Sequence, residues 1–314
     1  MDLFQHYILV GVCVGFLIIG SFGNIISIVI FTRKEFIKQP TTFYLIISNI
    51  INLITILYLP FIVMPKIWTI LLAETISCQL FCGFMLVLGE MQSWVYSMCS
   101  LDRCITTVAP YKFHFKNKSK FQLTLLFLFI LIIILLCVPF LYYYREFKLE
   151  SGNQTVCLFP QSIELNWVII YFKVQFGLFR TILPFIITIS ASLITVFKLC
   201  SSKLNLNVRD RNDMNREIQF AKTLIIMDIL FVVFRIPTAV NIFFQFNMLF
   251  AYTFLYSIFA LLGVFHNVFI FLIFIIFNKI YRQLFKVLIF GNTGKIKIVY
   301  HRFLVHLDVF TIRK

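Results

Sequence analysis

The chain has 314 residues, a length that suits one or two soluble domains, but 61% of its residues are hydrophobic and only 13% are charged. The chain also has 40 phenylalanines, and its few charged side chains cannot cover this much apolar surface. Lipid is therefore the expected solvent. The net charge of +15 could suggest nucleic acid, but no basic soluble module with interleaved aromatic residues is present, so we expect no nucleic-acid partner.

Seven long apolar stretches bounded by charged residues predict seven membrane-spanning helices. Each stretch has about 24 to 33 residues, which at ~1.5 Å per residue is enough to cross a hydrocarbon core of ~30 Å. In chain order they cover residues 7–31, 42–65, 76–108, 121–144, 166–198, 217–245 and 249–277. We therefore predict an all-α membrane protein built as a seven-transmembrane helix bundle.

The Lys and Arg residues predict the orientation of this bundle. Most of the 28 basic side chains fall on one side of the membrane if the N-terminus is extracellular, and cytoplasmic loops retain such charge. We expect a multi-pass protein of the plasma membrane with its N-terminus outside, and contact between the basic loops and anionic membrane lipids. In the longest outer loop, Asn153-Gln154-Thr155 forms a glycosylation sequon, although chance sequons such as Asn117-Lys118-Ser119 also occur.

The third stretch ends in Leu101-Asp102-Arg103-Cys104 and begins near Cys78, and Cys157 follows the fourth stretch. This arrangement resembles the rhodopsin-like (class A) G-protein-coupled receptors, whose third helix starts with a disulfide-bonded cysteine and ends with a Glu/Asp-Arg-Tyr triplet. Further matches run along nearly the whole chain: Gly23-Asn24, Pro60, Trp68, Pro184, Phe231, Phe234, Pro237 and the start of a short amphipathic eighth helix at residues 278–282. The resemblance implies a receptor domain over residues 1–290 and a cytoplasmic tail over residues 291–314.

The resemblance also gives roles to the two cysteines and to the charged pair. It implies a Cys78–Cys157 disulfide that tethers the second outer loop over the mouth of the bundle; two unpaired thiols are the alternative. It implies that Asp102 holds the Arg103 guanidinium until a heterotrimeric G protein offers other acceptors. Taken alone, an Asp-Arg dipeptide is also typical of an ordinary basic anchor at a cytoplasmic helix end.

Five polar residues are expected to form the inner polar core of the bundle: Asn24, Asn52, Gln92, His266 and Asn267. Asn52 stands where the family usually has an aspartate, so this core has no carboxylate and the sodium site of the family should be weak or lost. Other departures are Arg235 at the sixth-helix Trp position, Ser192 at the fifth-helix Tyr position and a seventh helix without the usual Asn-Pro-x-x-Tyr. These departures affect switch positions rather than the positions that define the fold.

Three charged residues inside the spans are expected to meet at similar depth: Glu90, Arg180 and Arg235. Charge inside a membrane is costly, so such side chains normally face the bundle and are paired. One carboxylate and two guanidiniums leave a net charge of +1, which suits an acidic group on a ligand; a closed structural triad is the alternative. Other residues expected to line this site are Gln175, Asn241, Gln245 and, below them, Trp94. A fourth charge, Asp228, is expected to cap a neighbouring basic residue.

These features predict a receptor that binds an extracellular ligand within the helix bundle and activates a heterotrimeric G protein. A peptide, such as a neuropeptide, is favoured over a biogenic amine, because Met85 replaces the aspartate that amine receptors place seven residues after the cysteine. Two alternatives stay open: a chemosensory or orphan receptor of a divergent family, and a seven-span channel or transporter. We expect no enzyme activity, no metal site and no cofactor, since no motif for such chemistry is found.

Overall fold

The computed structural model describes residues 3–37, 41–63, 77–108, 118–143, 145–148, 155–158, 170–171, 173–203, 208–244 and 254–291. Each of the seven predicted spans corresponds to a long helix in these residues, and the short amphipathic helix follows the last of them, as predicted. The helices of the bundle are α1 (Leu3–Phe31), α3 (Thr41–Val63), α5 (Cys78–Val108), α6 (Lys118–Tyr143), η2 (Gln175–Ile182) continuing into α8 (Leu183–Lys203), α9 (Val208–Phe244) and α10 (Phe254–Phe277). The short α2 (Lys34–Ile37) lies between α1 and α3, and α11 (Lys279–Phe290) follows α10.

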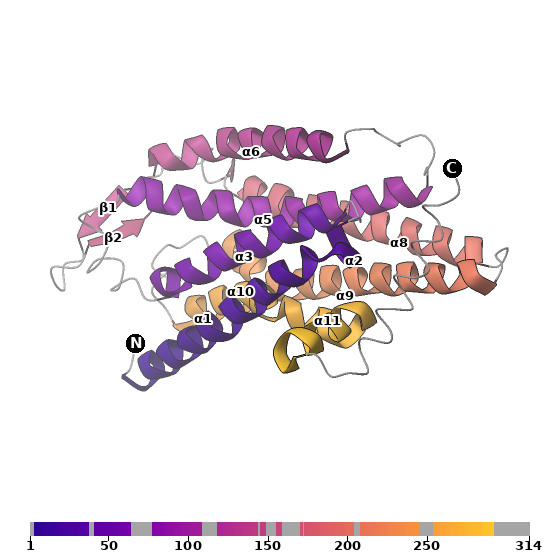
Figure 1. The fold of residues 1–314 in the computed structure, drawn as a ribbon. Helices are drawn as coiled ribbons and strands as arrows, with labels where there is room; N and C mark the ends of the chain where they lie inside the picture. Colours follow the sequence, from indigo (N-terminus) through magenta and orange to yellow (C-terminus); the bar gives the residue numbers. More distant parts are fainter. Residues whose placement is uncertain are drawn as a thin grey trace.

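The long helices run up and down beside one another in a single elongated bundle (Figure 1). A two-stranded hairpin of β1 (Arg145–Lys148) and β2 (Thr155–Leu158) lies at the end where α1 begins, and α2 and α11 lie toward the other end. We refer to these as the hairpin end and the α11 end. Helix α5 is central and contacts α3, α6 and α8, whereas α6 packs on the outside of the bundle against α5.

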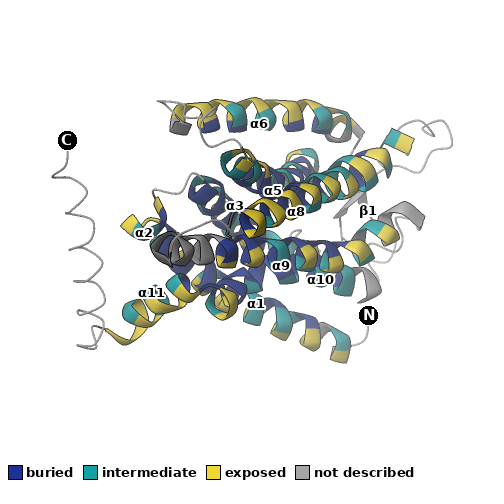
Figure 2. Ribbon diagram, turned by 90° about the vertical axis from the view of Figure 1, so that its right-hand side faces the viewer, coloured by how far each residue is buried: buried dark blue, intermediate teal, exposed yellow. Residues whose placement is uncertain are grey.

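The apolar composition of the helices explains the side chains that remain exposed. Within the described residues, five helices are long and apolar enough to cross a membrane: Tyr7–Phe31, Thr41–Phe61, Lys120–Pro139, Gln175–Ser201 and Ser257–Phe277. Their outward faces carry large apolar side chains such as Phe197, which is 74% exposed, and Figure 2 shows such exposed residues along α6. These faces are suited to lipid, because the transfer of apolar side chains from water into hydrocarbon is favourable.

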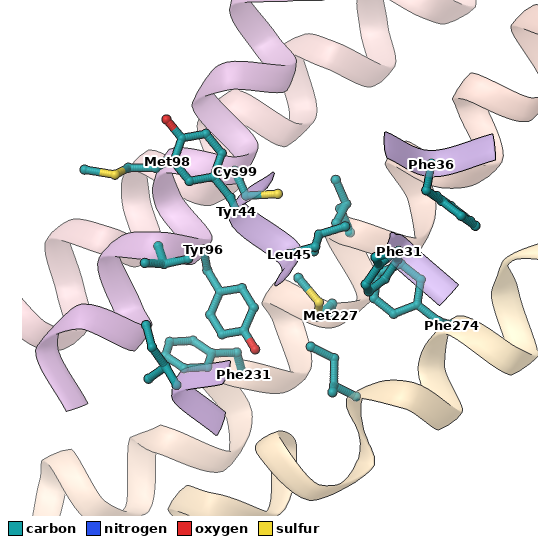
Figure 3. Close-up of a cluster of buried hydrophobic side chains, with 14 of the residues drawn as sticks. Phe31, Phe36, Tyr44, Leu45, Tyr96, Met98, Cys99, Met227, Phe231 and Phe274 are labelled. Carbon is teal, nitrogen blue, oxygen red and sulfur yellow. The ribbon is translucent and has the colours of Figure 1, made fainter. Parts of the chain in front are cut away.

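The core of the bundle is an apolar cluster to which α1, α3, α5, α9 and α10 contribute most of the buried side chains. The Tyr96 ring on α5 packs against Phe231 on α9 with centroids 5.3 Å apart, and Phe31 on α1 packs edge-on against Phe274 on α10 at 5.1 Å (Figure 3). Offset and edge-on ring pairs of this kind add to the stabilisation from buried area. The cluster therefore holds five helices together between the hairpin end and the α11 end.

The hairpin is a feature that the sequence did not predict. Its strands pair antiparallel with Glu146 opposite Cys157, and both strands contact α5, the helix that begins at Cys78. The strand that contains Cys157, β2, lies near α5. The side chains of Cys78 and Cys157 lie outside the described part of the chain. Asn153 of the sequon also lies outside it.

Helix η2 is the second unpredicted feature, a π-helical stretch directly before Pro184. The backbone N–H of Leu183 donates to Leu178 O, and the hydroxyl of Thr181 donates to Phe176 O at 3.0 Å, so both reach back five residues instead of four. Proline has no N–H to donate to the preceding turn, and π-helical turns occur mostly as local widenings at functional sites. Arg180 lies in the last turn of this π-helical stretch.

Candidate functional site

A chain of hydrogen-bonded amides crosses the middle of the bundle. Gln92 Nε2 on α5 donates to Asn52 Oδ1 on α3 at 2.7 Å and also to Asn267 Oδ1 on α10. Asn52 Nδ2 reaches Asn24 Oδ1 on α1 at 3.3 Å, and Asn24 Nδ2 donates to the backbone oxygen of Asn267 at 2.9 Å. All four side chains are fully buried, so four of the five residues expected in the polar core meet in one network.

Arg235 joins this network from α9. Its Nη2 donates to Gln92 Oε1, and its guanidinium lies over the Phe231 ring at 5.1 Å. The side chain is 9% exposed, so this polar contact forms in a medium of low dielectric constant, where it is stronger than in water. The sequence had placed Arg235 in the ligand site alone; the structure connects it to the polar core as well.

His266 makes ring contacts rather than hydrogen bonds. Its imidazole packs edge-on between the rings of Tyr96 and Phe231, with both centroid distances at 5.4 Å. Neither ring nitrogen has a hydrogen-bond partner among the described residues. His266 is thus buried beside the amide network, but it belongs to the aromatic cluster.

The three charged residues expected to form the ligand site lie close enough to interact. Glu90 on α5 is 2% exposed, and its carboxylate is attracted by both Arg180 and Arg235, while the two guanidiniums repel one another. Glu90 Oε1 has no hydrogen-bond partner in the described part of the chain. The structure therefore brings together one carboxylate and two guanidiniums from α5, η2 and α9.

Gly89 makes room for one of these guanidiniums. The Arg180 guanidinium lies over the Phe176 ring at 4.8 Å and against the backbone of α5 at Gly89. A methyl group at Gly89 would overlap the guanidinium nitrogens, so only a glycine permits this approach. The π-helical turn and Gly89 together position Arg180 beside Glu90, and neither had been singled out from the sequence.

At the α11 end, Arg103 is covered by aromatic rings. The side chain is 6% exposed and its guanidinium lies 4.8 Å from the centroid of Phe220 on α9. Phe220 in turn contacts Phe36 on α2 and Phe274 on α10, with centroids 6.4 and 6.3 Å apart. Asp102, expected to hold Arg103, accepts a hydrogen bond from Gln122 Nε2 on α6 at 3.1 Å.

Asp228 on α9 does not have the role expected from the sequence. It is 3% exposed, and its Oδ2 accepts hydrogen bonds from the hydroxyls of Ser100 on α5 at 3.3 Å and Ser192 on α8 at 3.2 Å. The expectation of a cap for a neighbouring basic residue is therefore wrong for the described residues. A buried carboxylate needs hydrogen-bond donors, and α5 and α8 present short hydroxyl side chains at the depth of Asp228.

Residues 23–288 match the family model described as 7 transmembrane receptor (rhodopsin family). The chain belongs to this family. No curated protein matches the chain. The family is one of multi-pass membrane receptors and not of enzymes, so the match favours the receptor prediction over the channel or transporter alternative.

The eighth helix of this receptor is anchored to the bundle by a tyrosine. Asn278 caps α11 by accepting from the backbone N–H of Tyr281 at 3.0 Å. The Tyr281 hydroxyl lies 2.7 Å from Ser27 Oγ on α1, and burial raises the pKa of this phenol above its ordinary value. Tyr281 is fully buried against Phe31 and Phe274, although the seventh helix of the receptor itself has no tyrosine at the usual place.

The remaining residues expected at the ligand site are only partly placed. Gln175 of the receptor is 2% exposed on η2, and its Nε2 has no hydrogen-bond partner among the residues described. Asn241 lies on α9, but its side chain lies outside the described residues, and so does Gln245 as a whole. Trp94 packs on Phe129 of α6, with the ring centroids 5.3 Å apart.

Proposed function

We propose that this receptor binds an extracellular ligand through an acidic group between its helices and activates a heterotrimeric G protein. The observation that carries the proposal is the single carboxylate of Glu90 beside the two guanidiniums of Arg180 and Arg235. Charges inside a membrane protein face the bundle and are matched by opposite charges. Among the described residues of this site the two guanidiniums outnumber the carboxylate by one, and a carboxylate on a ligand would match the second guanidinium.

The chemistry of arginine supports an acid as the ligand group. Guanidiniums bind carboxylates through two parallel hydrogen bonds, and charge-assisted bonds of this kind are the strongest hydrogen bonds in proteins. Arg180 projects from a π-helical turn against Gly89, so it is held beside Glu90 rather than extended toward lipid. Gln175, five residues earlier on the same helix, offers an amide N–H for the rest of the ligand.

A peptide is the ligand class that we favour. Pro60 interrupts α3 at the place where peptide receptors of the resembled family often have a proline, and Met85 occupies the place of the amine-binding aspartate. A peptide with a free C-terminus also carries the carboxylate that the surplus positive charge requires. The proposed entrance is the hairpin end, which the orientation predicted from the basic residues places outside the cell, with the Cys78–Cys157 disulfide beside it.

The proposed coupling site is the α11 end. A G protein would insert its C-terminal helix against Arg103 and offer oxygen acceptors in exchange for the Phe220 ring. Oxygen acceptors bind a guanidinium more strongly than an aromatic face does, so the exchange is favourable once α9 moves aside. Asp102 and Arg103 are the residues assigned to coupling.

The experiment is a screen of peptide pairs that differ only in a free or an amidated C-terminus, read as G-protein activation in cells that express the receptor. We expect active peptides to require the free carboxylate and to lose potency about 30-fold or more on Arg180→Gln, because a charge-assisted hydrogen bond is lost. Lys120→Gln is the matched control, since it removes an exposed charge from α6. Peptides that act equally as acid and amide, on both wild type and Arg180→Gln, would contradict the proposal.

A further inference from the structure

Gln92 is the residue at which the charged site and the polar core meet. Its Oε1 accepts from Arg235, and its Nε2 donates to both Asn52 and Asn267. An amide has one oxygen and two N–H donors, and all of these groups on Gln92 are engaged. Gln92 thereby joins the Arg235 guanidinium to the amide network by hydrogen bonds.

The contact with Arg235 is directional and buried on both sides. Gln92 is fully buried and Arg235 is 9% exposed, so water cannot replace either partner when the contact opens. Opening it leaves an amide oxygen without a donor in a medium of low dielectric constant, which is unfavourable. The Arg235–Gln92 hydrogen bond therefore restrains α9 against α5 at mid-depth.

Arg235 also retains capacity to bind something else. Its Nε has no hydrogen-bond partner among the described residues, it is attracted by Glu90 and it is repelled by Arg180. A carboxylate placed between the two guanidiniums would relieve the repulsion and would offer a charged acceptor where Gln92 offers a neutral one. Since a carboxylate adds an opposite charge and a second acceptor oxygen that the Gln92 amide lacks, such an anion competes with Gln92 for Arg235.

We propose that Gln92 is a positioning residue that holds Arg235, and with it α9, on the polar core, and that release of this hydrogen bond switches the receptor. Arg235 then sets efficacy while Arg180 sets affinity. The competing acid on a ligand rests on the proposed function, but the restraint by Gln92 does not. The restraint predicts how the empty receptor behaves.

The test uses the empty full-length receptor and needs no ligand. Gln92→Met removes the acceptor at similar volume, Arg235→Met removes the donor, and Gln92→Glu keeps an acceptor for Arg235. A fluorophore on Cys200, an exposed free cysteine at the α11 end of α8, reports movement near α9, in a background where Cys104 and Cys82 are alanine. Nucleotide exchange on added heterotrimeric G protein is measured on the same samples.

We expect Gln92→Met and Arg235→Met to shift the Cys200 emission and to raise basal exchange about five- to tenfold, as loss of a hydrogen bond to a charged group implies. The double variant should have a smaller effect than the sum of the two single effects, because the Arg235–Gln92 contact is lost in both single variants. Gln92→Glu should rescue the wild-type emission. Thr55→Val on α3 is the control, because this hydroxyl bonds only to Ile51 of its own helix in the described structure.

Additive effects of the two Met substitutions, or wild-type emission in both at normal surface expression, would overturn the proposal. If Arg235→Met fails to reach the surface, Arg235→Lys is substituted, since it keeps the charge and shortens the reach to Gln92. A shift of Cys200 emission without nucleotide exchange would support the restraint and count against G-protein coupling. The restraint by Gln92 and the coupling to G protein can therefore be contradicted by different measurements.

Discussion

Two buried arginines of this receptor lie in different surroundings. Arg235 lies among polar groups, including Gln92 and Glu90, in a region that we call the polar middle, whereas Arg103 lies against an aromatic ring at the α11 end. In the middle, Arg235 donates to Gln92 and interacts with Glu90, so its position depends on the direction of individual polar groups. At the α11 end, Arg103 lies over the face of the Phe220 ring, a contact that supplies no hydrogen-bond acceptor. The difference supports the proposal that the polar middle responds to one acidic group, whereas Arg103 exchanges its aromatic contact for a partner that offers oxygen acceptors.

The comparison predicts the largest effect at Arg103. Arg103→Ala should reduce G-protein activation to background, because the variant loses the buried guanidinium that we assign to coupling, while surface expression and ligand binding are retained. Nucleotide exchange on purified G protein measures this. Arg33→Ala, an exposed arginine at the same end, is the control and should behave as wild type. Signalling that persists in Arg103→Ala would sink the assigned role.

Asp228 is a buried polar residue near the aromatic α11 end, and we expect its hydrogen bonds to stabilise the receptor. Asp228→Leu leaves the hydroxyls of Ser100 and Ser192 without their acceptor, at a cost of about 1–3 kcal/mol. The midpoint of thermal unfolding in detergent should fall by several degrees. Asp228→Asn keeps an oxygen acceptor and should lie close to wild type. Equal unfolding midpoints for Asp228→Leu and wild type would show that the three-helix contact contributes nothing.

The aromatic cover of Arg103 should restrain the resting receptor modestly. Phe220→Leu removes a buried cation–π contact of about 1–2 kcal/mol, so basal nucleotide exchange should rise several-fold. Phe220→Tyr keeps the ring face and should keep the low basal rate. Phe197→Leu changes an exposed phenylalanine on the lipid-facing side of α8 and serves as the control. A basal rate that is the same in the Leu and Tyr variants would remove the cation–π explanation.

Gly89 tests the polar middle with a single methyl group. Gly89→Ala should displace the Arg180 guanidinium and lower the potency of acidic ligands about tenfold, with normal surface expression, because the end of a long side chain can move. Gly11→Ala meets open space and should change nothing. Concentration–response curves for a free-acid peptide compare the two. Unchanged potency in Gly89→Ala would mean that Arg180 does not bind the ligand in this position.

The smallest effect concerns sodium. The polar core contains amides and the Arg235 guanidinium, so it offers a cation no carboxylate and already holds a positive group. Replacing potassium by sodium should therefore change ligand affinity by less than about twofold. Competition binding in the two salts measures this. A clear loss of agonist affinity in sodium would reveal a cation site elsewhere in the bundle.

The sequence predicted the seven helices and most of the polar core, because long apolar runs and their family-like spacing carry that information. It could not predict contacts that depend on side-chain reach. Arg235 joins Gln92 across two helices, and Asp228 finds its donors on α5 and α8, neither of which is adjacent in sequence. The π-helical turn before Pro184 had only the proline itself as a signal, since an extra residue in an apolar run leaves no pattern.

The central claim is that the polar middle receives a ligand from outside the cell and the α11 end faces the cytoplasm. Access of an antibody to a tag at the C-terminus, on intact and on permeabilised cells, tests this most directly. The account predicts labelling only after permeabilisation, since the orientation predicted from the basic residues places α11, which follows α10, on the cytoplasmic side. Labelling of intact cells would invert the bundle, place Arg103 outside the cell and contradict the assignment of both sites.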